Sequence, residues 1–174
     1  MQATSTTPDL EAVVSEIEIA APRERVFQAL TDATQLECWF SDPSCPVRFW
    51  EMDARPGAGR YRYLTEKGTV VVNNMSEFEC QGEILELDPP RILTYTWIAN
   101  WHDDVTCRTV VRWELTPKLG GTHVKVTHSG LKNLPIARKD YSGGWARRSE
   151  DAERIRRAVN SRQTRLPAAV DFVF

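Results

Sequence analysis

The fold of this chain is decided by the stretch Tyr141-Ser-Gly-Gly-Trp-Ala-Arg-Arg-Ser-Glu-Asp-Ala-Glu-Arg-Ile-Arg-Arg-Ala-Val-Asn-Ser-Arg162. It contains no proline, and after its two glycines it is rich in Ala, Arg and Glu, which are good helix formers. We therefore predict a helix that opens at the glycine pair and runs for about five turns. Its buried face at helical spacing consists of Trp145, Ser149, Ala152, Ile155 and Val159. Because much of this face is small, we expect the helix to leave a ligand-sized space beneath it.

The segment before this helix, Thr122–Gly130, has the alternation of a half-buried strand. Val124 and Val126 share one face with His128, whereas His123 lies on the other. We therefore expect His128 to point into the domain. Two interpretations of it stay open: a core histidine hydrogen-bonded to a neighbour, or a ligand-facing acid/base group. The two histidines lie on opposite faces and cannot bind one metal ion together.

The rest of the chain predicts one strand, two short helices and then a series of strands. The first strand begins at Val13, a helix begins near Pro22, and a second helix covers 34–40. Strand signals joined by short turns follow up to Gly130, and 70–74 fits either a strand or a loop. Such strands pair antiparallel, so we predict an α+β domain with the long helix across a curved sheet. We assign residues 1–11 to a disordered lead, 12–162 to the domain and 163–174 to an apolar tail of open role.

Composition and charge exclude several classes of function. The formal net charge of -2 favours neither nucleic acid nor an anionic membrane, and no run approaches the ~18 apolar residues of a membrane span. The four cysteines lack C-x-x-C or zinc-site spacing, and the polar start of the chain does not resemble a signal peptide, so we expect a reduced, cytoplasmic protein. No P-loop, G-x-S-x-G or H-E-x-x-H motif is present. We predict no cofactor and no metal, and interpret His102-Asp103-Asp104 as a solvated loop.

Aromatic side chains are concentrated on the predicted inner face of the sheet and on the helices. An ordinary aromatic core and a ligand pocket are both consistent with this pattern. The small face of the last helix favours a pocket, because it does not supply the volume that native packing density requires. The residues that we predict to contact a ligand are Trp39, Phe40, Trp50, Tyr61, Tyr95, Trp97, Trp113, His128, Trp145 and Ser149.

Several short stretches also carry a family resemblance. Ile17-Glu-Ile-Ala-Ala-Pro-Arg-Glu-Arg-Val-Phe-Gln-Ala-Leu30 resembles the opening of the SRPBCC (START-like, helix-grip) superfamily. Four further stretches resemble the family named for the activator of heat-shock-protein-90 ATPase homologue, across roughly 13–160. They are Asp53-Ala-Arg-Pro-Gly57, Gly82-Glu-Ile-Leu-Glu-Leu-Asp-Pro-Pro90 with Leu93-Thr-Tyr-Thr-Trp97, Gly121-Thr-His-Val-Lys-Val-Thr-His-Ser-Gly130, and Gly144-Trp145.

The resemblance implies a helix-grip fold with a hydrophobic cavity between the sheet and the C-terminal helix. Proteins of this kind bind lipids, polyketides or other apolar small molecules, and some catalyse cyclisation or hydration inside the cavity. Family members usually carry bulky aliphatic residues at the positions of Ser149 and Ala152. The smaller residues of this chain imply either a larger cavity or a shifted helix register.

Three hypotheses about function follow. The first is a protein that binds a small apolar or aromatic molecule in the cavity. The second is an enzyme in the same cavity with His128 as general acid/base, although the sequence offers no inward carboxylate to pair with it. The third, suggested only by the family name, is a co-chaperone of a heat-shock ATPase. A homodimer is compatible with each.

Overall fold

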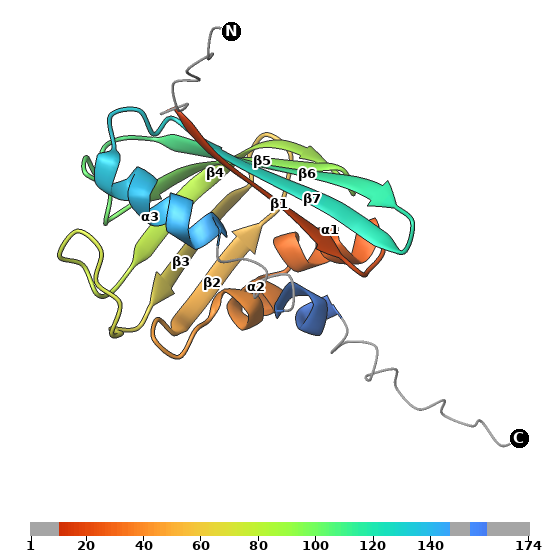
Figure 1. Ribbon diagram of the computed structural model, residues 1–174, viewed down its shortest axis with the longest axis horizontal. Coiled ribbons are helices and arrows are strands. Elements are labelled where there is room, and N and C mark those ends of the chain that lie inside the picture. Colours follow the sequence, from red (N-terminus) through yellow and green to blue (C-terminus); the bar gives the residue numbers. More distant parts are fainter. Residues whose placement is uncertain (1–10, 147–153, 160–174) are drawn as a thin grey trace, which may run out of the picture.

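The computed structural model describes residues 11–146 and 154–159 of the 174-residue chain (Figure 1). Seven strands, two short helices after the first strand and a third helix after the last strand make up the described part. In chain order they are β1 (Ala12–Ile19), α1 (Arg23–Thr31), α2 (Ala33–Phe40), β2 (Val47–Asp53), β3 (Arg60–Thr65), β4 (Glu79–Asp88), β5 (Ile92–Ala99), β6 (Thr109–Lys118), β7 (Gly121–Ser129) and α3 (Pro135–Ala146). A further helical segment covers 154–159.

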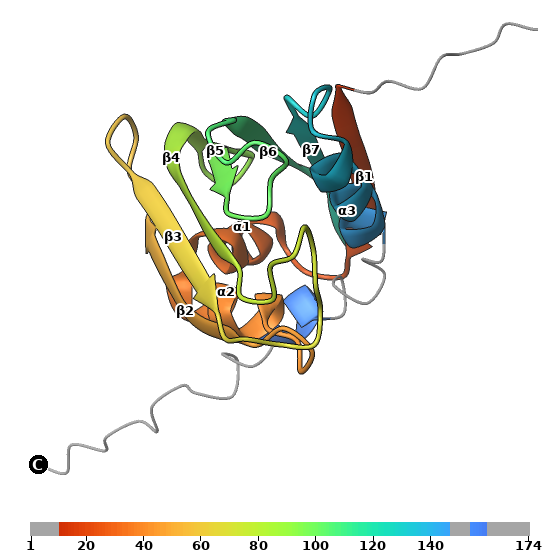
Figure 2. The ribbon, with the colours of Figure 1, turned by 90° about the vertical axis from the view of Figure 1, so that its left-hand side faces the viewer.

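The seven strands form one antiparallel sheet in the order β1-β7-β6-β5-β4-β3-β2. Figure 2 shows this sheet curving from β2 and β3 round to β7 and β1, with α1 and α2 inside the curve. The first strand and the second strand therefore form the two opposite edges, and α1 and α2 connect them across the concave side. Helix α3 packs against β1. The protein thus has the predicted α+β helix-grip fold, with a curved sheet that does not close into a barrel.

Alternation along β3, β6 and β7 separates a buried inner face from an outer face that contacts solvent, whereas five consecutive residues of β5 are buried. In β7, Val124, Val126 and His128 are buried, whereas His123 and Lys125, which point the other way, are half-buried. The predicted inward direction of His128 is therefore correct. His123 instead lies beside Glu16 of β1, with 3.1 Å between its Nε2 atom and the carboxylate. A side-chain period of two fixes these faces once the strand and its register are set.

The two short helices fill the concave side of the sheet. Helix α1 buries Val26, Phe27 and Leu30, and α2 buries Leu36 and Trp39. The Asp32 side chain caps α2 by accepting a hydrogen bond from the Gln35 amide at 3.1 Å. The Trp39 indole donates to the Ala29 carbonyl at 2.9 Å and meets Trp113 edge-on. These contacts hold both helices against the aromatic inner face.

Helix α3 begins earlier than the sequence predicted. We expected it to open at the glycine pair, but it starts at Pro135 and continues through Gly143 and Gly144. The reason is a contact from outside the helix. The Asp103 carboxylate accepts hydrogen bonds from the Ile136 and Ala137 amides, both at 3.0 Å, and so satisfies amides of the first turn. Two internal glycines cost roughly 1 kcal/mol each relative to alanine, and this cap helps to offset that cost.

The remainder of the predicted C-terminal helix is described only in part. Residues 147–153, which include Ser149 and Ala152, and residues 160–162 lie outside the described residues. Within 154–159, Ile155 and Val159 are buried and Arg157 is exposed, in agreement with the predicted faces. Segment 70–74, which the sequence left open, is a turn closed by a bridge between Val72 and Met75.

Candidate ligand-binding cavity

Two adjoining chambers lie between the inner face of the sheet, the end of α2 and helix α3. The larger has a volume of about 190 Å³ and the smaller about 150 Å³. They share four wall residues, Phe40, Tyr63, Trp101 and Asp140. We call the pair the aromatic cavity. The larger chamber is completed by Cys45, Val47, Thr65, Val70, Val72 and Phe78, and the smaller one by Trp97, Tyr141 and Gly144.

The aromatic walls come from four separate parts of the chain. Phe40 is the last residue of α2, Tyr63 lies on β3, Trp97 lies on β5 and Trp101 follows β5. The ring centroids are 5.6 Å apart for Phe40 and Tyr63, 5.7 Å for Tyr63 and Trp97, and 6.4 Å for Trp97 and Trp101. These spacings are those of tilted and edge-to-face aromatic contacts. The rings therefore support one another and keep the walls in place.

The hydroxyl group of Tyr141 joins α3 to this wall. It lies 2.8 Å from the Trp97 indole nitrogen and 2.8 Å from the Nε2 atom of His102. An indole N–H can only donate, so the Tyr141 oxygen accepts from Trp97. The same oxygen is hydrogen-bonded to His102 Nε2, and the tautomer of the imidazole sets which of the two atoms donates.

His102 is buried, so the prediction of a solvated loop is wrong for this residue, whereas Asp103 and Asp104 are exposed as expected. Its side chain is 1% exposed, and burial lowers the pKa of the imidazole, although the Cys107 backbone and the Asp103 charge act in the opposite direction. The neighbouring Asp103 is exposed, as expected, but it caps α3. Desolvation is the largest single effect on the pKa of the Asp103 carboxyl and raises it, but the amides of Ala137 and Ile136, which stabilise the charged form, help to make the net shift a lowering. His102 and Asp103 thus tether α3 to the loop after β5.

His128 lies behind the cavity wall and lines neither chamber. It is fully buried, with its ring centroid 4.2 Å from that of Tyr141 and 5.9 Å from that of Trp97. Its Nε2 atom is 2.7 Å from the hydroxyl of Thr109, which itself donates to the Trp97 carbonyl at 3.0 Å. Because that hydroxyl has one proton, His128 is the donor in the pair. This arrangement is the hydrogen-bonded core histidine of the first interpretation.

The other residues predicted to contact a ligand divide into three groups. Phe40 and Trp97 line the cavity. Trp39, Trp50, Tyr61, Tyr95 and Trp113 are buried in the core, where they line neither chamber. There, Trp113 donates to the Tyr95 hydroxyl at 2.8 Å, the Tyr61 hydroxyl donates to the Thr96 carbonyl at 2.8 Å, and Trp50 stacks on Tyr63 at 4.5 Å. The side chain of Trp145 and all of Ser149 lie outside the described residues.

Most of the described wall residues were absent from the predicted set, among them Tyr63, Trp101, Asp140 and Tyr141. Tyr63 could have been found, because it shares a strand face with Tyr61. Trp101 follows β5 and is buried only because the loop after that strand folds back on α3. Asp140 and Tyr141 face the cavity because α3 begins at Pro135, which the local sequence does not indicate.

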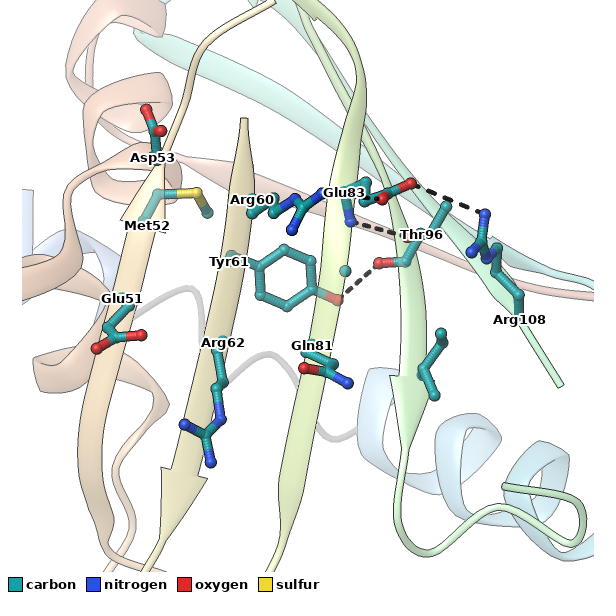
Figure 3. Close-up of a pocket in the computed structure, with 12 residues that line it drawn as sticks. Glu51, Met52, Asp53, Arg60, Tyr61, Arg62, Gln81, Glu83, Thr96 and Arg108 are labelled. Atoms are coloured by element: carbon teal, nitrogen blue, oxygen red, sulfur yellow. Dashed lines mark hydrogen bonds and ion pairs between the residues drawn. The ribbon is translucent and has the colours of Figure 1, made fainter. Parts of the chain in front are cut away.

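A larger depression, of about 610 Å³, lies on the outer face of β2 to β5 (Figure 3). Charged side chains surround it, and they pair with one another. Glu83 lies 3.8 Å from both Arg60 and Arg108, and Arg62 donates to Glu79 at 2.8 Å. These side chains are substantially exposed, so the pairs are weak and screened by solvent. A surface lined by charged side chains of both signs lacks the mostly apolar walls of a small-molecule site.

Two further features bear on the class of site. Within residues 11–146 and 154–159, no group of three or more His, Cys, Asp or Glu side chains is arranged to hold a metal ion. In the same residues, no helix is both long enough and apolar enough to span a membrane. In the part of the chain that the structure describes, the aromatic cavity combines mostly apolar walls with one carboxylate, and we take it as the candidate site.

Solved structures of similar proteins support the fold assignment. Protein NE0264 from Nitrosomonas europaea matches with a TM-score of 0.68 at 20% identity, covering 90% of this chain and 99% of its own. Ms6760 from Mycobacterium smegmatis has a TM-score of 0.68 at 21% identity, with 86% and 91% covered. MLL2253 from Mesorhizobium loti has a TM-score of 0.62 at 26% identity, with 89% and 99% covered. A search of curated proteins gave no match.

The sequence itself identifies the family. Residues 20–151 match the family described as "Activator of Hsp90 ATPase homolog 1-like protein". This range contains α1 to α3, all strands except β1, and every residue that lines the aromatic cavity. It also covers most of the chain. The protein therefore belongs to the Activator of Hsp90 ATPase homolog 1-like family.

Proposed function

We propose that this protein binds a small, largely apolar molecule in the aromatic cavity. The observation that carries the proposal is the pair of adjoining chambers, about 190 Å³ and 150 Å³, walled by Phe40, Tyr63, Trp97 and Trp101. A protein cavity of roughly 150 Å³ lined by apolar side chains is large enough for a benzene ring. Each Å² of apolar surface that leaves water contributes about 25 cal/mol to such binding. The two chambers together suit a molecule with one or two small rings or a short branched chain.

Two glycines of α3 provide a matched test. A Cβ atom added at either Gly143 or Gly144 meets nothing within 4 Å, but of the two only Gly144 lines the smaller chamber. We expect Gly144→Leu to fill this chamber and to weaken binding at least tenfold, whereas Gly143→Leu retains it. The measurement is a titration of small aromatic and alicyclic compounds, followed by tryptophan fluorescence and by the rise in unfolding temperature. The proposal fails if no compound in the panel binds, or if Gly144→Leu binds as tightly as Gly143→Leu.

The enzyme hypothesis has less support from the geometry. His128, the general acid/base in that hypothesis, lines neither chamber and donates its Nε2 proton to Thr109. A group that abstracts a proton from a substrate must come within hydrogen-bond reach of it. Exchange of His128 for glutamine would remove turnover if this hypothesis were right, and it would leave ligand binding largely unchanged under our proposal.

The family name also motivates a chaperone partner, which we keep as the alternative. It predicts that the purified protein changes the ATPase rate of a heat-shock ATPase at saturating concentration. We place the binding function in a reducing compartment such as the cytoplasm, a location consistent with four free cysteines, Cys38, Cys45, Cys80 and Cys107.

A further inference from the structure

We infer that the ligand of the aromatic cavity carries a positive charge, in the form of an alkylated ammonium group seated among the rings beside Asp140. This inference rests on the proposed function, because it specifies the chemical class of the molecule bound at that site. Two independent features of the cavity support it: the sign of its charge and the arrangement of its rings.

The charge of the described part of the cavity wall has one sign. Among residues 11–146 and 154–159, Asp140 is the one charged side chain that lines the two chambers, and no Lys, Arg or His of these residues lines either chamber. Asp140 belongs to the wall shared by both, so a molecule in either chamber lies near its carboxylate. An anionic molecule would place a like charge there in surroundings of low dielectric constant. The cavity therefore disfavours carboxylates and phosphates and favours neutral or cationic molecules.

The influence of this negative charge extends over several wall residues. Burial is the main cause that raises the pKa of Tyr63, of Tyr141 and of the Cys45 thiol, and the charge of Asp140 adds to all three shifts. Asp140 also has interactions of its own within the protein. A carboxylate offers about four acceptor positions on its two oxygens, so an ammonium group can be added to those interactions. Its partial burial strengthens the attraction, because a half-buried charge is less hydrated than an exposed one.

The rings provide the second feature. Phe40, Tyr63, Trp97 and Trp101 come from different elements and surround the same space, with successive ring centroids 5.6 to 6.4 Å apart. A cation within about 6 Å of a ring centroid is attracted by the negative face of the π-system, most strongly for tryptophan. Cages of aromatic rings recognise quaternary ammonium groups in this way. A trimethylammonium group is also bulky and apolar on its surface, so it gains from burial as a hydrocarbon group of the same shape does.

The test compares three molecules of nearly the same shape that differ in charge. They are choline, its neutral carbon analogue 3,3-dimethylbutan-1-ol, and the anion 3,3-dimethylbutanoate. We expect choline to bind roughly 3- to 30-fold more tightly than the alcohol, and the anion to bind most weakly. Binding is followed by amide chemical shifts in ¹H–¹⁵N NMR spectra and by the fluorescence of the wall tryptophans. The full-length protein is used throughout.

Two variants locate the effect. Asp140→Asn keeps the shape of the side chain and should reduce the advantage of choline over the alcohol at least threefold. Glu51→Gln removes one negative charge from the outer face of the sheet and should leave that advantage unchanged. NMR peak dispersion checks that both variants fold, and the comparison of three ligands on the unmodified protein stands without either variant.

The outcomes separate this inference from the proposed function. If the alcohol binds as tightly as choline, or if the anion binds most tightly, the charge inference is wrong and the apolar binding function stands. If none of the three binds while an aromatic compound does, the inference is again wrong. If nothing binds, both proposals fail together.

Discussion

Replacing Tyr141 by phenylalanine removes the one oxygen atom that joins helix α3 to two other parts of the chain. In the structure this hydroxyl accepts from the Trp97 indole at 2.8 Å and is hydrogen-bonded to His102 Nε2, also at 2.8 Å. Both partners are at most 2% exposed. The substitution keeps the ring and its packing but leaves the buried Trp97 indole N–H and the buried His102 Nε2 atom without their partner.

The expected loss follows from the cost of leaving such groups unpaired. A buried polar group that loses its hydrogen-bond partner costs about 1–3 kcal/mol. With two groups affected, and some relaxation of the helix, we expect Tyr141→Phe to lower the free energy of unfolding by about 3 kcal/mol. At 2–4 °C per kcal/mol for a domain of this size, the unfolding temperature should fall by roughly 6–12 °C.

Tyr63→Phe is the matched control. Tyr63 is also a buried cavity tyrosine, but its hydroxyl makes no hydrogen bond in the contacts found among the described residues. We expect this variant to lose less than about 1 kcal/mol. The assay is urea denaturation followed by tryptophan fluorescence, with thermal unfolding by circular dichroism as a second measure. If Tyr141→Phe lost no more stability than Tyr63→Phe, the hydrogen-bonding account of how α3 is held would be refuted.

Three further predictions concern the tether and the glycines. Burial lowers the pKa of His102, so the unfolded chain takes up a proton near pH ~6.5 that the folded protein excludes. The free energy of unfolding should therefore fall on acidification from pH 7, and it should fall less in His102→Gln. Equal pH profiles of the two proteins in urea denaturation would contradict this. The pKa of Asp103 is also lowered, so its contribution to the free energy of unfolding is present above its unfolded pKa of ~3.9 and is lost as pH falls through the folded pKa. Asp103→Asn should therefore flatten the dependence of stability on pH below pH ~4. An unchanged pH dependence in that range would contradict this account. A Cβ atom at Gly82 would lie 1.8 Å from the Thr96 carbonyl oxygen, so Gly82→Ala should lower the free energy of unfolding by about 1–3 kcal/mol. Gly143→Ala should raise it by about 0.5–1 kcal/mol, because a Cβ atom there meets nothing within 4 Å. Thermal unfolding that showed the opposite order of stability would rule out this reasoning.

The strands and the first two helices could be predicted because each carries its own local signal. Alternation in β7 gave the inward direction of His128, and the apolar spacing of α1 gave its buried face. These patterns depend on neighbours two to four residues away, and nothing in the rest of the molecule overrides them. The family resemblance then supplied the helix-grip arrangement. The family match over residues 20–151 confirms the family, and the structure shows the arrangement.

The start of α3 and the walls of the cavity could not be read in this way. Helix α3 begins at Pro135 because Asp103, more than thirty residues earlier, caps its first turn. That cap places Asp140 and Tyr141 against the sheet, and it draws His102 out of solvent. A contact between distant segments leaves no periodic trace in either of them, so the local pattern pointed to the glycine pair instead.

The connection through α1 and α2 has a consequence for the size of molecule that this protein accepts. Strands β1 and β2 are neighbours in sequence but form the two outermost positions of the sheet. Helices α1 and α2 link these two strands across the concave side of the sheet, so β1 and β2 cannot move apart unless α1 and α2 also shift. Accommodation of a bulkier guest is therefore expected at the end of α2, where Phe40 meets the cavity. Selection of variants that bind larger ligands should therefore yield substitutions near Phe40 before it yields substitutions in the strands.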